Sequence, residues 1–439
     1  MNLQKLAVKI DKYIYYILLL TVAVIPLKQE LMAGLIAVNF LLALFVACFK
    51  KKTTPKILED WQQYALYLLF TIGIISIYFS KDRFLSGWNY LYVGGQYLGL
   101  VFVLLRYGLL DAETYDKVRE QGTEGIKEKF FAMPRPLQMI TVMLIVSIFV
   151  SLIGIAQKIL GITGEGIWVD PDQFPDLKVR VYSTLVNPNI LGGYLVLVVA
   201  YAVGWFYNFY HDYRKLKKLI AATGLLALVC LLYTYSRGNW IAAVVMLFAF
   251  TILFCKRAAL PVTIAGLIGL AMGGRAVIQR LTSITSGEDT SAALRIAYLE
   301  STVAIIEDFP FGVGWYGYRF VYPDYNFYLD DTSVIMYHCH NMFLNVWSEL
   351  GLHGLIVFLL VWGMFIKAGY KLAHEGTAPW FKAMGMSYVI ASVGIAVGGL
   401  TDHVYFNTQM GCLFWLTGIL TMICYRLNKI NQNNHETIL

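Results

Sequence analysis

Two histidines stand two positions apart in the stretch His338-Cys339-His340-Asn341, immediately before a long apolar run. A histidine side chain ordinarily titrates near pH 6.5, so at neutral pH it can accept a proton from a sugar hydroxyl. On chemistry alone either histidine fits the role of a catalytic base, and the plainer alternative is a structural hydrogen bond. The pair is therefore a candidate for acid–base chemistry.

A zinc site is a second interpretation of the same residues. Alternate residues of an extended strand point the same way, so both histidines could bind one ion together with Asp402 and His403. The spacing matches no usual zinc pattern, and we therefore expect no metal. An ionisable pair such as Asp402-His403 at the end of an apolar run is a functional candidate by default, whereas the alternative is a structural helix cap.

Two arginines are candidates for binding a diphosphate. Arg237, beside Gly238, lies in a polar break within the apolar stretch 219–255. A guanidinium there can bind a diphosphate in bidentate fashion, and the free N–H groups of the next helix start would add to anion binding. The alternative is an arginine that extends to the lipid headgroups. Arg295, one helical turn from Tyr298, is the second candidate, although it could be an exposed loop residue. Arg180, Arg275, Arg280 and Arg319 are other arginines on the same predicted side.

The composition is that of a membrane protein. Of the 439 residues 58% are hydrophobic and 14% charged, against about 25% charged in an average soluble domain, and the mean hydropathy is +0.60. These values exclude an ordinary soluble enzyme and a disordered chain. The six cysteines show no CxxC, so we expect no disulfide framework.

The hydropathy pattern predicts an all-α polytopic membrane protein with about twelve transmembrane helices in a single domain, 1–439. The expected spans are 12–27, 31–49, 62–79, 88–106, 137–160, 187–208, 219–235, 240–255, 258–275, 345–366, 383–400 and 404–425. Most of the 35 lysines and arginines then fall in loops on one side, which the positive-inside rule makes cytoplasmic, together with both termini. The net charge of +7 is therefore a topology signal, and we expect no nucleic-acid partner.

The longest segment between spans, 276–344, is predicted to lie on the outer side between the ninth and tenth spans. A helix is expected from Ala292 to Asp308, ended by Pro310 and the glycines after it. We expect this segment to cap the bundle with one or two helices. No nucleotide-binding motif occurs, so we expect chemistry on the outer face without a cofactor.

The order of these motifs resembles the O-antigen ligase superfamily, which also contains some O-antigen polymerases and protein O-oligosaccharyltransferases. The resemblance covers most of 150–426. The residues that carry it are Asn187-Pro188-Asn189, Ser236-Arg237-Gly238-Asn239-Trp240, Arg295, Phe309-Pro310-Phe311-Gly312-Val313-Gly314, and His340-Asn341 with Leu344, Glu349, Gly351 and Gly354.

This resemblance implies transfer of a glycan from a polyprenyl (undecaprenyl) diphosphate carrier to lipid A–core, at the periplasmic face of the bacterial inner membrane. The reaction would be inverting and metal-independent. By the same resemblance Arg237 and Arg295 match the arginines that hold the diphosphate, and His340 matches the base because it directly precedes Asn341; His338 would support it. The expected partners are the donor, the glycan acceptor and membrane lipid.

Seven further residues are expected to support the site: Gln157, Asn239, Tyr298, Asn341, Glu349, Asp402 and His403. Two other functions stay open. One is an O-antigen or exopolysaccharide polymerase, which uses a second carrier-linked glycan as acceptor. The other is a transporter for a small anion such as bicarbonate, which should show an internal repeat that we do not find.

Overall fold

A computed structural model describes residues 3–50, 56–109, 130–131, 133–163, 179–208, 214–264, 266–268, 271, 290–327, 335–403 and 406–436. These residues form helices and no strand, as the sequence predicts. The labelled α-helices are α1 (Leu3–Val24), α2 (Gln29–Phe49), α3 (Asp60–Ser76), α4 (Arg83–Tyr107), α7 (Arg135–Leu160), α8 (Pro188–Asn208), α9 (Arg214–Tyr233), α10 (Arg237–Leu253), α12 (Thr290–Asp308), α13 (Tyr318–Val321), α14 (Met342–Glu375), α15 (Pro379–Gly399) and α16 (Thr408–Glu436).

Eight helices in the described residues are long and apolar enough to cross a membrane: α2, α3, α7, α8, α9, α14, α15 and α16. The chain is therefore a multi-pass membrane protein. The expected count of about twelve is not confirmed. The first half of α1 carries several charges, the polar stretch Gly94-Gly95-Gln96 lowers the hydropathy of α4, and α10 has only 17 residues. Of the span expected at 258–275, residues 265, 269, 270 and 272–275 lie outside the described residues.

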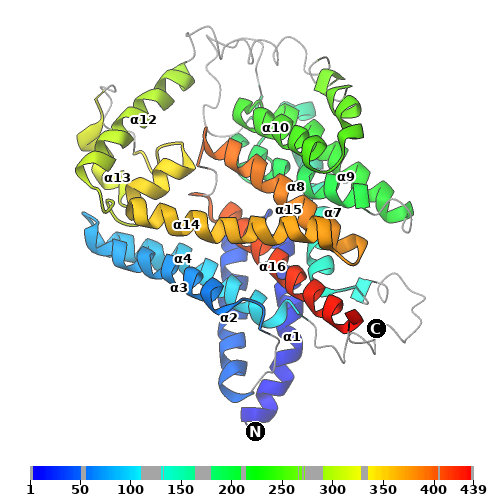
Figure 1. Cartoon of the computed structure of the whole chain (residues 1–439). Helices are drawn as coiled ribbons and strands as arrows, with labels where there is room; N and C mark the ends of the chain where they lie inside the picture. The colour runs from blue at the N-terminus through cyan, green and yellow to red at the C-terminus, as the bar shows by residue number, and fades with distance from the viewer. Residues whose placement is uncertain are drawn as a thin grey trace.

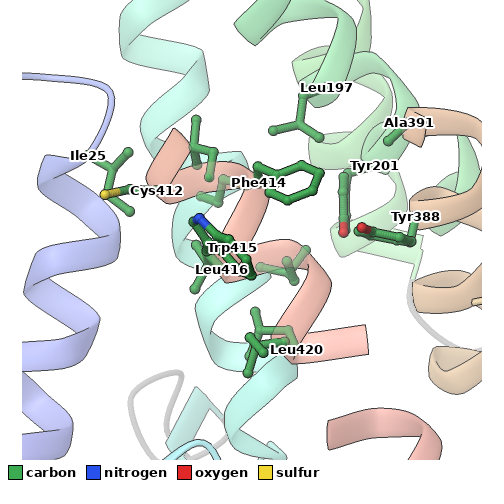
Figure 2. Packing of buried hydrophobic residues seen from close by; sticks show 14 of the residues in the cluster. Ile25, Leu197, Tyr201, Tyr388, Ala391, Cys412, Phe414, Trp415, Leu416 and Leu420 are labelled. Atoms are coloured by element: carbon green, nitrogen blue, oxygen red, sulfur yellow. The ribbon is translucent and has the colours of Figure 1, made fainter. Parts of the chain in front are cut away.

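The core of the bundle is built around α16. In this helix 83% of the most apolar stretch is buried, and in α15 the value is 78%. Figure 2 shows Phe414 and Trp415 of α16 close to Leu197 and Tyr201 of α8, with Tyr388 of α15 beside them. Since lipid is as apolar as these side chains, close packing between helices stabilises this arrangement.

Segments that the sequence places on one side of the membrane meet in the structure. On the predicted inner side Lys50 Nζ lies 2.7 Å from Asp11 Oδ2, and Arg106 Nη2 donates to the carbonyl of Lys50. On the predicted outer side the hydroxyl of Thr184 donates to the carbonyl of Pro26 at 2.5 Å. Each of these contacts joins segments assigned to the same side, and which side is cytoplasmic stays a prediction.

This topology leads to a direct prediction. Reporter fusions are expected to give a cytoplasmic signal at positions 54, 125, 215 and 375, and an outer-side signal at positions 170, 285 and 330. The physical reason is the basic bias of the inner loops. The measurement is a pair of complementary reporters, each active on one side only. A cytoplasmic signal at 330 would remove the basis for the proposed site.

A break in α14 holds the segment from α12 to α13 in place. Gly351, with φ 72°, interrupts the long helix, so carbonyls before it lose their helical partners. The carbonyls of Ser348 and Glu349 instead accept from the N–H groups of Val313 and Gly314, at 2.8 and 2.9 Å. Gly312 must be glycine at this contact, because a Cβ there would lie 2.4 Å from the carbonyl oxygen of Glu349.

The helix predicted from Ala292 to Asp308 is confirmed as α12, and it ends before Pro310 as expected. Figure 1 shows α12 and α13 together at the N-terminal end of α14. A small core separate from the main one joins them; it contains Tyr298 of α12, Tyr318 of α13 and Cys339 beside the histidines. The break in α14 and this small core therefore position α12 against the His338–Asn341 stretch.

Candidate active site

The centre of the site is a pair formed by His340 and Asp402. His340 Nδ1 lies 3.0 Å from Asp402 Oδ1, although 62 positions separate them in the sequence. His340 adopts a left-handed backbone conformation with φ 55°, which is uncommon for a non-glycine residue and turns the chain into α14. When Nδ1 donates to the carboxylate, Nε2 is left with a lone pair that can accept a proton. This is the arrangement in which a carboxylate orients a histidine base.

Asp402 accepts two further hydrogen bonds. Its Oδ2 accepts a hydrogen bond from Asn189 Nδ2 at 2.9 Å, and its Oδ1 accepts from the backbone N–H of His403 at 2.8 Å. Burial alone would raise the pKa of this carboxyl. The hydrogen bond from His340, together with the electrostatic effect of His340, His338 and Arg295, holds the pKa of this carboxyl well below its usual range.

Asn189 connects the pair to the starts of two helices. Its Oδ1 accepts from Arg180 Nη2 and its carbonyl accepts from Asn239 Nδ2, both at 2.9 Å. The helix start predicted at Asn187-Pro188-Asn189 is confirmed, because the Asn187 side chain accepts from the N–H of Asn189. The contact between Asn189 and Asp402 was not predicted. An asparagine in the first turn of a helix does not indicate a contact with a distant residue.

Arg237 is the first residue of α10, as its place in the polar break predicts. The next residue, Gly238, packs so closely on Thr401 that a Cβ at Gly238 would lie 2.2 Å from Thr401 Oγ1. The start of α10 therefore lies against the residue that precedes Asp402. A helix N-terminus favours negative charge, so this position suits an arginine that binds an anion.

Arg295 reaches the same site from α12. The ring of Tyr298 stacks on the ring of His340, with centroids 5.5 Å apart and planes inclined by 24°. Burial raises the pKa of Tyr298, while the charge of Arg295 lowers it, and the same charge acts on Asp402. The structure thus brings the second predicted arginine beside the pair.

The other arginines considered from the sequence are placed differently. Arg319 lies over the rings of Tyr316 and Tyr337, with its Cζ 5.1 and 4.9 Å from their centroids, and one of its Nη groups donates to the Tyr316 hydroxyl. Arg180 donates to Asn189 and, through Nε, to the carbonyl of Thr234. Arg275 and Arg280 lie outside the described residues.

His338 and His403 line up beside His340. The ring centroid of His338 lies 4.5 Å from that of His340 and 5.7 Å from that of His403. Burial, with like charge from neighbouring histidines, lowers the pKa of His338 to about 4 and that of His403 to about 3. Both side chains are therefore neutral at pH 7. His403 Nδ1 is buried and has no hydrogen-bond partner among the described residues.

A cavity of about 470 Å³ opens next to His403 between α3, α4, α14 and α16. This volume lies within the range of roughly 300–1,000 Å³ found for ligand pockets. Aromatic side chains form a large part of its wall, and the polar side chains Asn345 and Glu349 also line it. Phe406, another lining residue, has its ring centroid 4.9 Å from that of His338.

Three of the predicted supporting residues hold the backbone around the site. Asn341 caps α14, since its Oδ1 accepts from the N–H groups of Phe343 and Leu344 at 3.0 Å. The Oε1 of Glu349 accepts from the N–H of Tyr318 at 3.4 Å. Gln157 is buried, and its Oε1 accepts from the N–H groups of Tyr182 and Ser183 at 3.1 and 2.8 Å. Whether these three also contact substrate stays a prediction.

Fold and site together define a multi-pass helical membrane protein with a histidine–aspartate pair, two arginines and a deep cavity on one side of its bundle. Residues 222–359 match the family model described as O-Antigen ligase, which confirms the resemblance to the O-antigen ligase superfamily predicted from the sequence. The matched segment contains Arg237, Arg295 and His340, whereas Asn189 and Asp402 lie outside it. No curated protein matches the chain.

Proposed function

We propose that this protein transfers a glycan from a polyprenyl diphosphate carrier to a hydroxyl of lipid A–core, on the outer face of the bacterial inner membrane. The family match supports a membrane glycosyltransferase of the ligase or polymerase type. The observation that carries the proposal is the His340–Asp402 pair, which lies within reach of Arg295 and next to the start of α10. A base and two anion-binding groups are what this reaction requires.

In the proposed step the acceptor hydroxyl gives its proton to Nε2 of His340 as its oxygen attacks the anomeric carbon of the donor sugar. The bond from this carbon to the diphosphate oxygen breaks, and its electron pair leaves with the carrier diphosphate. Arg237 and Arg295 stabilise the negative charge that develops there. Attack from the side opposite the leaving group inverts the anomeric centre.

Asp402 acts through His340. Its ionised carboxylate fixes the tautomer with the proton on Nδ1, and it stabilises the imidazolium that forms when Nε2 takes the second proton. The hydrogen bonds from Asn189 and from the N–H of His403 hold the carboxylate in this orientation. Asn189 and Asp402 are thus positioning residues in this proposal.

The cavity beside His403 suits a sugar. Its aromatic rings offer flat apolar faces, and the side chains of Asn345 and Glu349 can exchange hydrogen bonds with hydroxyl groups. The buried Nδ1 of His403 is a further group for such a bond. We therefore propose that the glycan binds in this cavity.

The experiment is a transfer assay with the purified full-length protein in lipid, in which the carrier-linked glycan and lipid A–core are added separately. Glycosylated lipid A–core, formed only when both are present, is the expected result. Longer glycans formed from the donor alone would identify the protein as a polymerase and not as a ligase. Absence of both products under conditions in which the protein is folded would contradict the proposed function.

Chelation is expected to leave the reaction intact. Two arginines supply positive charge at the leaving group, and the proposed base needs no metal to accept a proton. Initial transfer rates measured with and without excess EDTA should therefore agree within about twofold. A loss of activity that added zinc restores would instead make His338, His340, Asp402 and His403 a catalytic metal site.

A further inference from the structure

We propose that His338, His340 and Asp402 form a capture site for a divalent transition metal such as Zn²⁺, and that this site coincides with the proposed base. Only the predicted effect of the metal on glycan transfer rests on the proposed function. The metal site itself is inferred from the positions of the donor atoms. It differs from a catalytic zinc, because the bound ion would block the reaction.

The donor atoms are already close together. One ligand atom from each of the three side chains lies within 4.8 Å of the other two, and two of them, His340 Nδ1 and Asp402 Oδ1, are 3.0 Å apart. Imidazole nitrogen and carboxylate oxygen are ordinary zinc ligands, and a site with three protein ligands keeps a fourth position for water. An inward shift of about 1 Å would bring the set to the spacing that metal–ligand distances near 2 Å require.

His403 is the nearest candidate for the fourth position. Its ring lies 5.7 Å from that of His338, and its Nδ1 is buried without a hydrogen-bond partner among the described residues. An unpaired buried nitrogen costs free energy that a metal bond would recover. The charge of Arg295, which acts on Asp402, opposes a bound cation. We therefore expect reversible capture and not a permanent structural ion.

Metal capture has a chemical consequence for the proposed reaction. A metal bound through Nδ1 of His340 leaves the proton of the neutral ring on Nε2, so that Nε2 cannot accept another proton. A carboxylate bound to the metal also no longer orients the ring. Zn²⁺ is therefore expected to lower the turnover of transfer without weakening the binding of the carrier diphosphate, and EDTA is expected to reverse the effect.

The test is direct metal binding to the full-length protein in detergent. Co²⁺ serves as a visible-absorption probe, and Zn²⁺ affinity is measured by competition. We expect one ion per chain. His338→Gln and Asp402→Asn, which preserve size and polarity, should each weaken binding more than about 10-fold, since loss even of a residue that orients a ligand costs 10–100-fold. His374→Gln, at the far end of α14, is the matched control and should bind as the parent does.

Thermal unfolding with and without Zn²⁺ checks that the variants are folded, because an ion that binds only the native state raises the midpoint. Equal Co²⁺ binding by the parent, His338→Gln and Asp402→Asn would overturn the inference. So would an absence of binding by a folded parent protein. The transfer assay tests the proposed function separately. If the parent protein binds Co²⁺ through these residues but transfers no glycan, the inferred metal site holds and the proposed ligase function is wrong.

Discussion

Arg237→Ala is expected to abolish glycan transfer while the protein remains folded and inserted. Arg237 begins α10 at the surface that packs on Thr401, so its removal takes away a cation at the proposed diphosphate without opening the core. Removing a preorganised group that stabilises a developing negative charge lowers the rate by roughly 10²–10³-fold. In the proposed reaction both donor binding and departure of the leaving group depend on Arg237. The measurement is transfer by protein matched for amount and detergent behaviour.

Two variants make this result specific. Arg237→Lys should recover little activity, because a point charge cannot reproduce the planar bidentate fork. Arg83→Ala is the matched control, since Arg83 lies on the same predicted side but contacts only the ring and carbonyl of Tyr78 in the described structure. It should keep full activity. An active Arg237→Lys would indicate that any positive charge suffices and would contradict bidentate binding.

His340→Ala is expected to lower the transfer rate by roughly 10²–10⁴-fold, the usual contribution of a general base. Binding of the carrier should change little, because the arginines hold the diphosphate. Rates and donor affinity measured on the same preparation separate the two effects. Asp402→Asn keeps the shape of the pair and removes the charge, so a substantial loss of rate is expected there as well.

The neighbouring variant His338→Ala should be milder, since His338 contacts His340 from the side and its Nδ1 accepts only from the backbone N–H of that residue. The comparison is a ranking of two variants in one assay. An inactive His338→Ala beside an active His340→Ala would move the base to His338. Near-full activity of both would end the proposal of base catalysis by this loop and direct attention to His403 and Glu349.

Local patterns in the sequence predicted the elements that carry the site. The polar break around Arg237 ends one helix and starts the next, as observed between α9 and α10. The helix that ends before Pro310 and the helix start at Asn187-Pro188-Asn189 were also predicted. These features depend on a few neighbouring residues, through capping, proline and hydropathy, and such interactions are visible in the sequence.

Contacts between distant segments could not be predicted in this way. Asn189 and Asp402 are 213 positions apart, and the sequence around either residue does not indicate that the two are in contact. The break at Gly351 is another example. A single glycine in an apolar helix usually remains helical, and it is the docking of Val313 and Gly314 that uses the carbonyls left open there. The number of spans is not confirmed for a related reason, because hydropathy alone does not decide whether a short or charged helix crosses the membrane.

The central claim is that a carrier diphosphate leaves as the glycan is transferred. The most direct test is to measure free polyprenyl diphosphate in the reconstituted assay and to compare it with the amount of glycosylated acceptor. The account predicts one diphosphate released per glycan transferred, release only when the acceptor is present, and loss of both products together in Arg237→Ala and His340→Ala. Glycan transfer without release of the diphosphate, or release that continues unchanged in His340→Ala without acceptor, would contradict it.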